Sequence, residues 1–478
     1  MYKARKDKGS LEILFININP RPNWTKEVTM LYFPIGLCSI ISETKKNGFK
    51  YDLLDLMNEP KNDGELRSAI GRKKYDIVAL GSLLHAYWII KPLLAMIKEI
   101  QPDSLVILGN YVATLIPEKI LSWTKADVAV IGEGEKTFIE ILNKVISGES
   151  LSGIKGIAYK DAAKIILEEQ RPPVKNLDDT GFPSWDVFDV EAYINSAKKL
   201  KSHRFFKDIS KLRAFPIITA KGCPFRCTFC TNNQYWKYNP YRRHSVGYVI
   251  SMIKKLQERY QINYFRFADE LSFDNLKDIE LLADAIIREK INAFFEAIIR
   301  VGLFKKTDKA LAKKLRDCGF VMMYYSLESA NPEILKAMNK RIEIKQFYEQ
   351  KAVLDEAGIV SGTNLVIGYP QETEESIAGS FRVCYENDIM PSVCFLLPAP
   401  GSYMYDYARQ KGYILDEEKY ITEIGEQQFI NLNMTKMSND ILQGLTVYHL
   451  KRIRDKLKLN IPDENLICSI VLKQDCFN

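Results

Sequence analysis

Short apolar segments with the pattern of β-strands alternate with segments of helical periodicity in two separate blocks of the 478-residue sequence. The first block has five strand patterns, at residues 12–18, 50–56, 75–81, 104–109 and 126–132. Helical patterns lie between or after them, including residues 89–100, 117–123 and 135–145. This alternation predicts a parallel sheet covered by helices on both faces. We therefore expect residues 1–148 to form an α/β domain.

The strand order of this domain determines where a ligand would bind. In a flavodoxin-like sheet, ligands lie beyond the carboxyl ends of the first and third strands. Those ends are residues 17–21 and 82–86. Both segments are therefore candidates for a binding site.

The second block, residues 215–400, has six strand patterns, at 215–220, 263–268, 293–300, 321–327, 361–367 and 392–397. Six β–α units predict an incomplete TIM-like barrel, with its chemistry at the carboxyl ends of the strands. Residues 149–214 contain a small hairpin pattern at 156–167 and then an irregular, proline-containing stretch, which indicates a linker. Residues 401–478 are predicted to be mostly helical.

Composition excludes several classes of protein. Apolar residues make up 46% and charged residues 27%, which is typical of a folded globular chain. The sequence has no signal-peptide pattern and no apolar run of about 20 residues, so a cytoplasmic location without a membrane span is expected. The net charge of +7 is mild, and the basic run at 198–213 is better explained as a solvated helical face than as a nucleic-acid site.

Three of the nine cysteines, Cys223, Cys227 and Cys230, directly follow the first strand pattern of the second block. Thiolates suit iron–sulfur clusters or zinc, and both usually have four ligands. This loop supplies three, and His244, fourteen residues further on, is a possible fourth ligand for zinc. A cluster with one iron free to bind another molecule fits the spacing better than zinc or unrelated cysteines.

The loop resembles the signature of the radical S-adenosylmethionine superfamily, including the aromatic Phe229 before the last cysteine. The resemblance implies that Cys223, Cys227 and Cys230 hold a [4Fe–4S] cluster whose free iron binds S-adenosylmethionine. Electron transfer from the reduced cluster would then cleave S-adenosylmethionine to a 5′-deoxyadenosyl radical.

Segments that follow the later barrel strands also resemble this family. Glu270 lies in an acidic segment after the second strand, and Arg300 ends the third. Glu328 and Ser329 belong to the fourth-strand motif Tyr-Ser-Leu-Glu-Ser-Ala, and Gly368 follows the fifth strand. The resemblance implies that these five residues contact S-adenosylmethionine.

An α/β domain before such a barrel resembles the cobalamin-binding radical S-adenosylmethionine proteins, and the resemblance spans residues 11–400. It implies that cobalamin is contacted by Ser82, Leu84, His85, Gly109 and Gly132. Residues 17–21 lack the histidine of the DxHxxG motif, and Asn110 replaces the second of the family's paired glycines. Cobalamin would then be held with its own base detached. His85 could approach the cobalt or simply pack at a helix start.

The resemblance implies an anaerobic enzyme that takes electrons from reduced flavodoxin or ferredoxin and acts on a small molecule. Members of the family most often transfer a methyl group by way of cobalamin to an unactivated carbon or phosphorus centre. Other members cyclise or rearrange their substrates, and the sequence does not separate these outcomes. A non-catalytic iron–sulfur or corrinoid protein is a further alternative, although an electron carrier would not need Glu328 or the fifth-strand segment.

Overall fold

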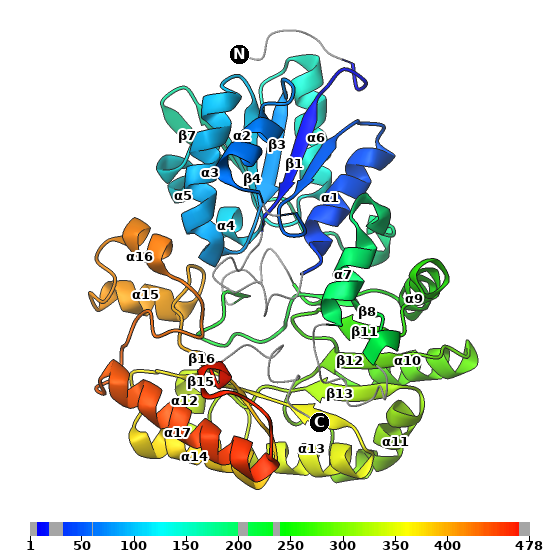
Figure 1. Ribbon diagram of the computed structural model, residues 1–478, viewed down its shortest axis with the longest axis vertical. Coiled ribbons are helices and arrows are strands. Elements are labelled where there is room, and N and C mark those ends of the chain that lie inside the picture. Colours follow the sequence, from blue (N-terminus) through cyan, green and yellow to red (C-terminus); the bar gives the residue numbers. More distant parts are fainter. Residues whose placement is uncertain (1–6, 19–31, 60, 199–208, 233–239, 468–478) are drawn as a thin grey trace.

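The computed structural model describes residues 7–18, 32–59, 61–198, 209–232 and 240–467 (Figure 1). The end of the expected ligand loop at 17–21 and most of the basic run at 198–213 lie outside the described residues. Among the described residues, no helix combines the length and the apolar character needed to cross a membrane.

The N-terminal domain is built on a seven-stranded sheet with the order β2-β1-β3-β4-β5-β6-β7. Its first five strands are parallel and follow the flavodoxin-like order, which confirms the expected fold class. The strands are β1 (Ile13–Asn17), β2 (Asp52–Asp55), β3 (Ile77–Gly81), β4 (Leu105–Gly109), β5 (Val128–Val130), β6 (Ile157–Asp161) and β7 (Lys164–Leu167). The helices are α1 (Ile35–Lys46), α2 (Asp63–Ile70), α3 (Tyr87–Ile100), α4 (Asn110–Thr114), α5 (Pro117–Trp123) and α6 (Glu135–Ser147).

Alternate residues of these strands pack against opposite helical layers. Ile13 and Phe15 of β1 face a core that includes Cys38 of α1 and Phe138 of α6. Leu14 and Ile16 belong to the core formed with α3, α4 and α5. Burial on both faces explains why the strands read as continuous apolar runs.

The segment expected to be a linker contributes more structure than the sequence indicated. Strands β6 and β7 form the expected hairpin, but β6 also pairs antiparallel with β5 and so extends the N-terminal sheet. A short helix, α7 (Val190–Ala197), was not anticipated. The Asp189 side chain accepts a hydrogen bond from the amide of Ala192 and caps this helix.

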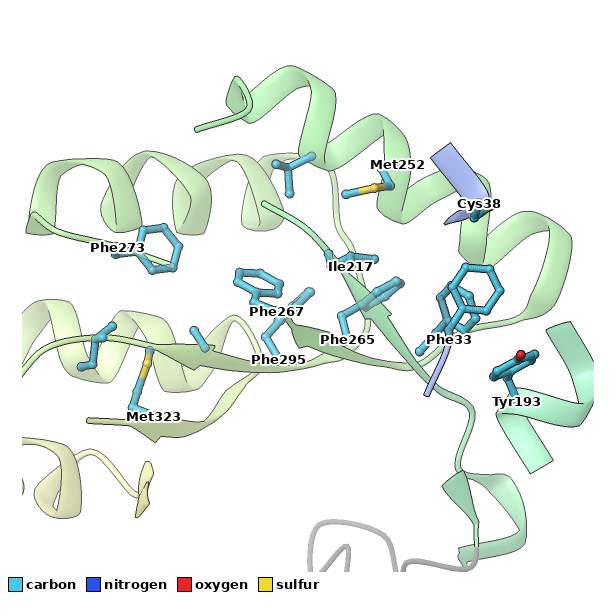
Figure 2. Packing of buried hydrophobic residues seen from close by; sticks show 14 of the residues in the cluster. Phe33, Cys38, Tyr193, Ile217, Met252, Phe265, Phe267, Phe273, Phe295 and Met323 are labelled. Carbon is cyan, nitrogen blue, oxygen red and sulfur yellow. The ribbon is translucent and has the colours of Figure 1, made fainter. Parts of the chain in front are cut away.

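The second domain contains the expected incomplete barrel of parallel strands. They are β8 (Ala214–Ile217), β11 (Tyr264–Phe267), β12 (Phe294–Ile298), β13 (Phe320–Tyr324), β14 (Val360–Gly362), β15 (Asn364–Ile367) and β16 (Ser392–Phe395). The surrounding helices are α9 (Val246–Tyr260), α10 (Leu276–Arg288), α11 (Lys309–Asp317), α12 (Pro332–Ala337), α13 (Ile344–Glu356) and α14 (Glu374–Glu386). Aromatic side chains such as Phe265, Phe267 and Phe295 form much of the core between strands and helices (Figure 2).

The fifth barrel strand, expected as one segment at 361–367, is interrupted at Thr363. Strand β14 pairs with β13, whereas β15 pairs with β16. A single parallel bridge between Glu328 and Leu365 connects the two parts of the sheet. The interruption therefore places Glu328 beside the fifth strand.

The C-terminal region is helical, as expected, with α15 (Tyr403–Gln410), α16 (Glu417–Glu423) and α17 (Asn439–Leu457). Helix α17 packs on α14, and α16 packs on α3 of the N-terminal domain. At the second contact Tyr87 of α3 donates a hydrogen bond to Glu418 (3.1 Å), and Lys119 of α5 also forms an ion pair with Glu417 of α16. The C-terminal helices thus join both domains.

Candidate functional site

The loop that carries Cys223, Cys227 and Cys230 is anchored by segments that follow the later barrel strands. The Thr228 amide donates to the Met338 carbonyl oxygen (2.9 Å), and its hydroxyl donates to the Ala337 carbonyl oxygen (2.8 Å). The Thr228 and Tyr369 hydroxyls are 2.8 Å apart. The Thr228 carbonyl oxygen accepts a hydrogen bond from the Met404 amide (3.1 Å). Hydrogen bonds to later segments of the chain therefore fix the backbone of this loop.

The start of the same loop is fixed by two neighbouring carboxylates. Asp269 is buried and accepts hydrogen bonds from the amides of Thr219 and Ala220 and from the Thr219 hydroxyl. Burial raises the pKa of Asp269 to about 6 against these hydrogen bonds. Glu270 accepts a hydrogen bond from the Gly222 amide (3.0 Å). Sequence reasoning selected Glu270 and missed Asp269, although both stand in the same acidic segment.

The three thiols are close enough to affect one another, and none of them is in a disulfide. Burial, together with the neighbouring Cys227 and Cys223, raises the pKa of Cys230 to about 12. Burial also raises the pKa of Cys227, whereas the nearby Lys340 and Arg300 lower it. Two fixed positive charges thus lie beside a thiol that must lose its proton to bind iron.

Glu328 has a strained backbone and a buried ionic partner. Its φ of 65° lies in the left-handed region that non-glycine residues seldom adopt. Its carboxylate accepts a hydrogen bond from the Lys340 ammonium group at 3.0 Å, and both residues are buried. Strain of this kind is common at functional sites, where the surrounding structure maintains it. Sequence reasoning did not identify Lys340.

Arg300 lies over a ring of the cysteine loop. Its guanidinium group is 3.5 Å from the centroid of the Phe225 ring, and it donates a hydrogen bond to the Lys340 carbonyl oxygen. Burial lowers the pKa of Arg300, whereas Cys227 and Cys223 oppose the shift. The expected residues Glu270, Arg300 and Glu328 are thus all beside the cysteines.

Gly368 and Ser329 have clear local roles. Gly368 has a φ of 114°, and its amide donates to the buried Glu372 carboxyl group (3.2 Å). The Ser329 hydroxyl accepts a hydrogen bond from the Asn331 amide (3.1 Å) and lies 3.3 Å from the Ser380 hydroxyl. Contacts of Gly368 and Ser329 with S-adenosylmethionine stay predictions.

His244, considered as a fourth ligand for zinc, is engaged elsewhere. Its Nδ1 lies 2.9 Å from an Asp178 carboxylate oxygen, and its ring stacks on Tyr248 at a centroid distance of 4.0 Å. This geometry gives His244 a structural role beside α9.

The residues expected to contact cobalamin surround the carboxyl edge of the N-terminal sheet. Ser82, Leu84 and His85 follow β3, and the last two belong to a short 3₁₀ turn, Leu84–Ala86. Gly109 ends β4, and the Gly132 amide, after β5, donates to the Thr114 hydroxyl (3.1 Å). These strands are neighbours in the sheet, so their ends lie along one edge.

Asn110 shows how this edge accommodates the replacement of a glycine. Its φ is 66°, and its side-chain oxygen accepts a hydrogen bond from the Tyr111 amide (2.7 Å). Asparagine tolerates the left-handed region better than most residues. The backbone shape that a second glycine would permit is therefore available.

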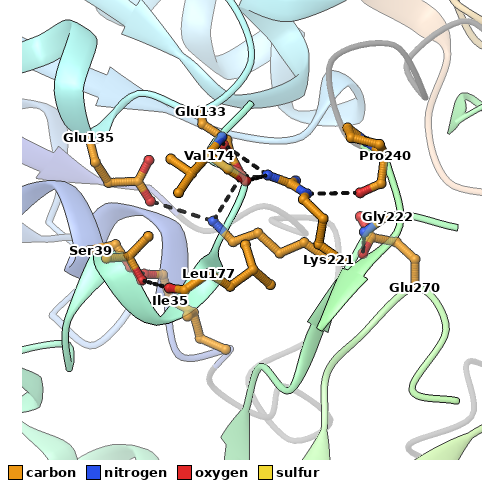
Figure 3. Close-up of polar contacts among 12 residues, drawn as sticks. Ile35, Ser39, Glu133, Glu135, Val174, Leu177, Lys221, Gly222, Pro240 and Glu270 are labelled. Carbon is orange, nitrogen blue, oxygen red and sulfur yellow. Dashed lines mark hydrogen bonds and ion pairs between the residues drawn. The ribbon is translucent and has the colours of Figure 1, made fainter. Parts of the chain in front are cut away.

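A polar contact joins this edge to the cysteine loop (Figure 3). Lys221, two residues before Cys223, lies 3.5 Å from Glu133 and 3.6 Å from Glu135. It belongs to strand β9 (Ala220–Lys221), which pairs antiparallel with β10 (Arg242–Arg243). Arg242 also binds Glu133, at 3.1 Å. The two glutamates after β5 therefore hold the base of the cysteine loop against the N-terminal sheet.

Comparison with known proteins agrees with this arrangement. Residues 25–142 match the B12 binding domain, and residues 217–384 match the radical SAM superfamily. An uncharacterised methyltransferase of Pyrococcus horikoshii is 27% identical over 81% of this chain and 82% of its own length. An anaerobic magnesium-protoporphyrin IX monomethyl ester cyclase of Rubrivivax gelatinosus is 25% identical over 86% of this chain and 72% of its own.

The fold is shared with the radical S-adenosylmethionine methyltransferase TsrM from Kitasatospora setae, solved with cobalamin and a [4Fe–4S] cluster. The TM-score is 0.69 at 15% identity, over 93% of this chain and 91% of that one. The two matched domains define the chain as an enzyme that joins a corrinoid domain to a radical-generating barrel. It belongs to the cobalamin-binding branch of the radical S-adenosylmethionine superfamily, whose cofactors are a [4Fe–4S] cluster, S-adenosylmethionine and cobalamin.

Proposed function

We propose that this enzyme methylates an unactivated carbon or phosphorus centre of a small molecule. The main support is the ionic contact of Lys221 with Glu133 and Glu135, which brings the carboxyl edge of the N-terminal sheet against the cysteine loop. A methyl carrier on one domain and a radical source on the other must both reach one substrate atom. The relatives whose names include a methyltransferase support the same choice.

In this proposal the residues of the chain have distinct tasks. Cys223, Cys227 and Cys230 hold the [4Fe–4S] cluster, which supplies one electron to S-adenosylmethionine. Glu328 binds a polar group of S-adenosylmethionine, and Arg300 is suited to its carboxylate through a forked pair of hydrogen bonds. The edge formed by Ser82, Leu84, His85, Gly109 and Gly132 holds cobalamin. Reduced flavodoxin or ferredoxin is the proposed electron donor.

Product analysis under anaerobic conditions tests this function. The holoenzyme would be incubated with candidate substrates and S-adenosylmethionine carrying a ¹³C-labelled methyl group. We expect the label in the product, together with 5′-deoxyadenosine, and neither from the Cys227→Ala variant. Formation of an unlabelled, cyclised or rearranged product would support the activity that the cyclase relative suggests. Absence of any S-adenosylmethionine cleavage would favour a non-catalytic binding protein.

A further inference from the structure

The loop that carries the three cysteines reaches the surface of the protein. Pro224 and Arg226, which lie between Cys223 and Cys227, are exposed, and Cys223 is partly exposed. A hollow of about 510 Å³ lies beside this tip of the loop, and Phe225 forms part of its lining. Transfer of an electron through protein weakens steeply with distance. The exposed tip therefore offers a short path between a docked protein and a cluster held by these cysteines.

Two later segments of the chain lie against this tip. In the segment that follows β12, the Arg300 guanidinium group is 3.5 Å from the centroid of the Phe225 ring, and Lys305 lines the same hollow. In the segment that follows α12, the Asn339 side chain donates a hydrogen bond to the Arg226 carbonyl oxygen (2.8 Å). Residues distant in the sequence thus form one continuous surface around the tip.

The charged side chains exposed on this surface are mostly basic. Four of the five basic residues, all except Arg226, form no ion pair within the part of the chain that the structure describes. We call the five together the cationic surface, which consists of Arg226, Lys305, Lys306, Lys336 and Arg341.

The carboxylates next to the cationic surface are engaged locally. Asp308 is only partly exposed and accepts a hydrogen bond from the Lys305 amide (2.7 Å). Asp274, which also lines the hollow, accepts a hydrogen bond from the Asn275 side chain (2.8 Å). The basic side chains therefore keep an excess of positive charge around the tip.

This excess of charge favours an acidic partner. Burial lowers the pKa of Arg300, and the charge of Arg341 lowers it further, whereas Cys227 and Cys223 oppose the shift. Like charges this close repel one another, and a negatively charged protein surface would relieve the repulsion and speed its own association. Exposed basic residues are often simply solvated. Here, however, they surround the exposed tip of the cysteine loop.

We propose that the cationic surface is the docking site of the electron donor, an acidic flavin or iron–sulfur protein. One electron passes from the donor, which is oxidised, to the cluster, which is reduced. The need for a donor rests on the proposed function, whereas the surface and the charge of its partner rest on the contacts described above. Transient redox complexes have small interfaces, below about 1,200 Å², so a surface of a few charged residues can be sufficient.

Binding of a flavodoxin with a large net negative charge to the anaerobic holoenzyme tests this assignment. We expect the combined Lys305→Glu, Lys306→Glu and Lys336→Glu variant to bind at least about tenfold more weakly than the wild type at low ionic strength, by calorimetric titration. The same three substitutions to glutamine should give a smaller loss. Both losses should shrink as salt is added, because salt screens exposed charges. Iron content and melting temperature verify that each variant is folded and loaded.

A matched control carries the same change of charge elsewhere. Lys50, Lys74 and Lys125 are exposed and precede β2, β3 and β5, so they lie at the edge of the N-terminal sheet opposite the cysteine loop. The triple glutamate variant at these positions should bind flavodoxin almost as the wild type does.

Formation of 5′-deoxyadenosine provides a second measurement. The variant of the cationic surface should be slow with reduced flavodoxin but should match the wild type with saturating dithionite, a small reductant that needs no docking site. An equal loss with both reductants, at normal iron content, would contradict a docking role.

Failure to bind flavodoxin by the wild type, or equal affinity of the two triple glutamate variants, overturns the assignment. Tighter binding of transfer RNA than of flavodoxin, lost in the same variant, would assign the surface to nucleic acid instead. Because binding is measured without turnover, absence of S-adenosylmethionine cleavage or of methyl transfer would count against the proposed function alone.

Discussion

Glu328 and Lys340 form a buried ion pair beside Cys227, and in the proposed function Glu328 also binds S-adenosylmethionine. Removal of one member of a buried pair leaves the other charge uncompensated and costs about 3–5 kcal/mol. Loss of a hydrogen bond from a charged group to a ligand costs less, about 1.5–3 kcal/mol. A single substitution therefore combines two effects, and a double substitution is needed to separate them.

We expect Glu328→Gln to lower both the melting temperature and the affinity for S-adenosylmethionine. Glu328→Gln combined with Lys340→Met should restore most of the stability but not the affinity, which should stay at least about tenfold below that of the wild type. Thermal unfolding and calorimetric titration with S-adenosylmethionine measure the two effects separately. Wild-type affinity in the double variant would remove Glu328 from the binding site.

Glu372 provides a second prediction at this scale, because burial raises its pKa from 4.5 to about 7. A carboxyl group whose pKa is raised in the folded state stabilises the fold most below pH 4.5, and this contribution is lost as the pH rises through 7. The wild type should therefore lose up to about 1.4 kcal/mol of unfolding free energy per pH unit in that range.

Glu372→Gln should remove most of this pH dependence, since an amide does not titrate in this range. Its oxygen can accept from the Gly368 amide, and its NH2 group can donate to the Ser376 hydroxyl. Glu374→Gln, at an exposed position in the first turn of α14, is the matched control and should keep the wild-type profile. Denaturant unfolding between pH 5 and pH 8 gives the comparison. Parallel profiles for wild type and Glu372→Gln would contradict the raised pKa.

Among the elements, the close approach of the chain segments that lead into β12 and β13 requires a glycine. Gly319 precedes β13 with a φ of 109°, and a Cβ at this position would lie 2.1 Å from the Ala293 carbonyl oxygen. A side chain would therefore add a backbone clash to the cost of an unfavourable dihedral angle.

We expect Gly319→Ala to destabilise the protein by more than about 2 kcal/mol. Gly412→Ala isolates the dihedral cost, because Gly412 has a φ of 74° and open space around its Cα. That control should lose only about 1 kcal/mol. Denaturant unfolding measures both, and equal losses would show that the contact with Ala293 relaxes freely.

The elements also show which features a sequence can predict. Long apolar strands and amphipathic helices follow from periodicity, and the five parallel strands of the first sheet and the six strand positions of the barrel were predicted in this way. Two features were not predictable, because they depend on partners distant in the chain. The pairing of β6 with β5 makes the linker part of a sheet, and the interruption at Thr363 depends on which neighbour each half of the strand joins.

The candidate site was predictable to a similar extent. The spacing of Cys223, Cys227 and Cys230 identified the loop, and the structure brings Glu270, Arg300 and Glu328 beside it. Lys340 could not be selected, because a lysine twelve residues after Glu328 has no periodic relation to it. Asp269 gave no signal that distinguished it from Glu270.

At the scale of the whole molecule, the two domains are joined by apolar and ionic contacts. Phe33 packs on Phe215 with a centroid distance of 4.7 Å. Although burial pushes the pKa of Glu133 up, Lys221 and Arg242 hold it below its usual value of 4.5. A carboxyl group whose pKa is lowered in the folded state stabilises the fold above pH 4.5, and this contribution is lost as the pH falls through its folded-state pKa. The ionic contact should therefore persist at neutral pH.

Replacement of Glu133 and Glu135 by glutamine should loosen β9 and β10 without unfolding the domains. We expect amide hydrogen exchange in residues 220–221 and 242–243 to accelerate about tenfold at neutral pH. Glu140→Gln is the control. It removes the ion pair between Glu140, which also lies on α6, and Arg171, and it should leave the exchange of these amides unchanged. Equal protection in the double variant would show that the apolar contacts alone hold the domains together.

The anchoring of Thr228 has a consequence for the supply of iron. Its hydrogen bonds to Ala337, Met338, Tyr369 and Met404 do not involve the cysteine thiols. Small zinc domains, by contrast, are unfolded until their ion binds. Here the loop that carries the thiols is held by these hydrogen bonds as well, so we expect the cluster to be inserted into an already folded chain.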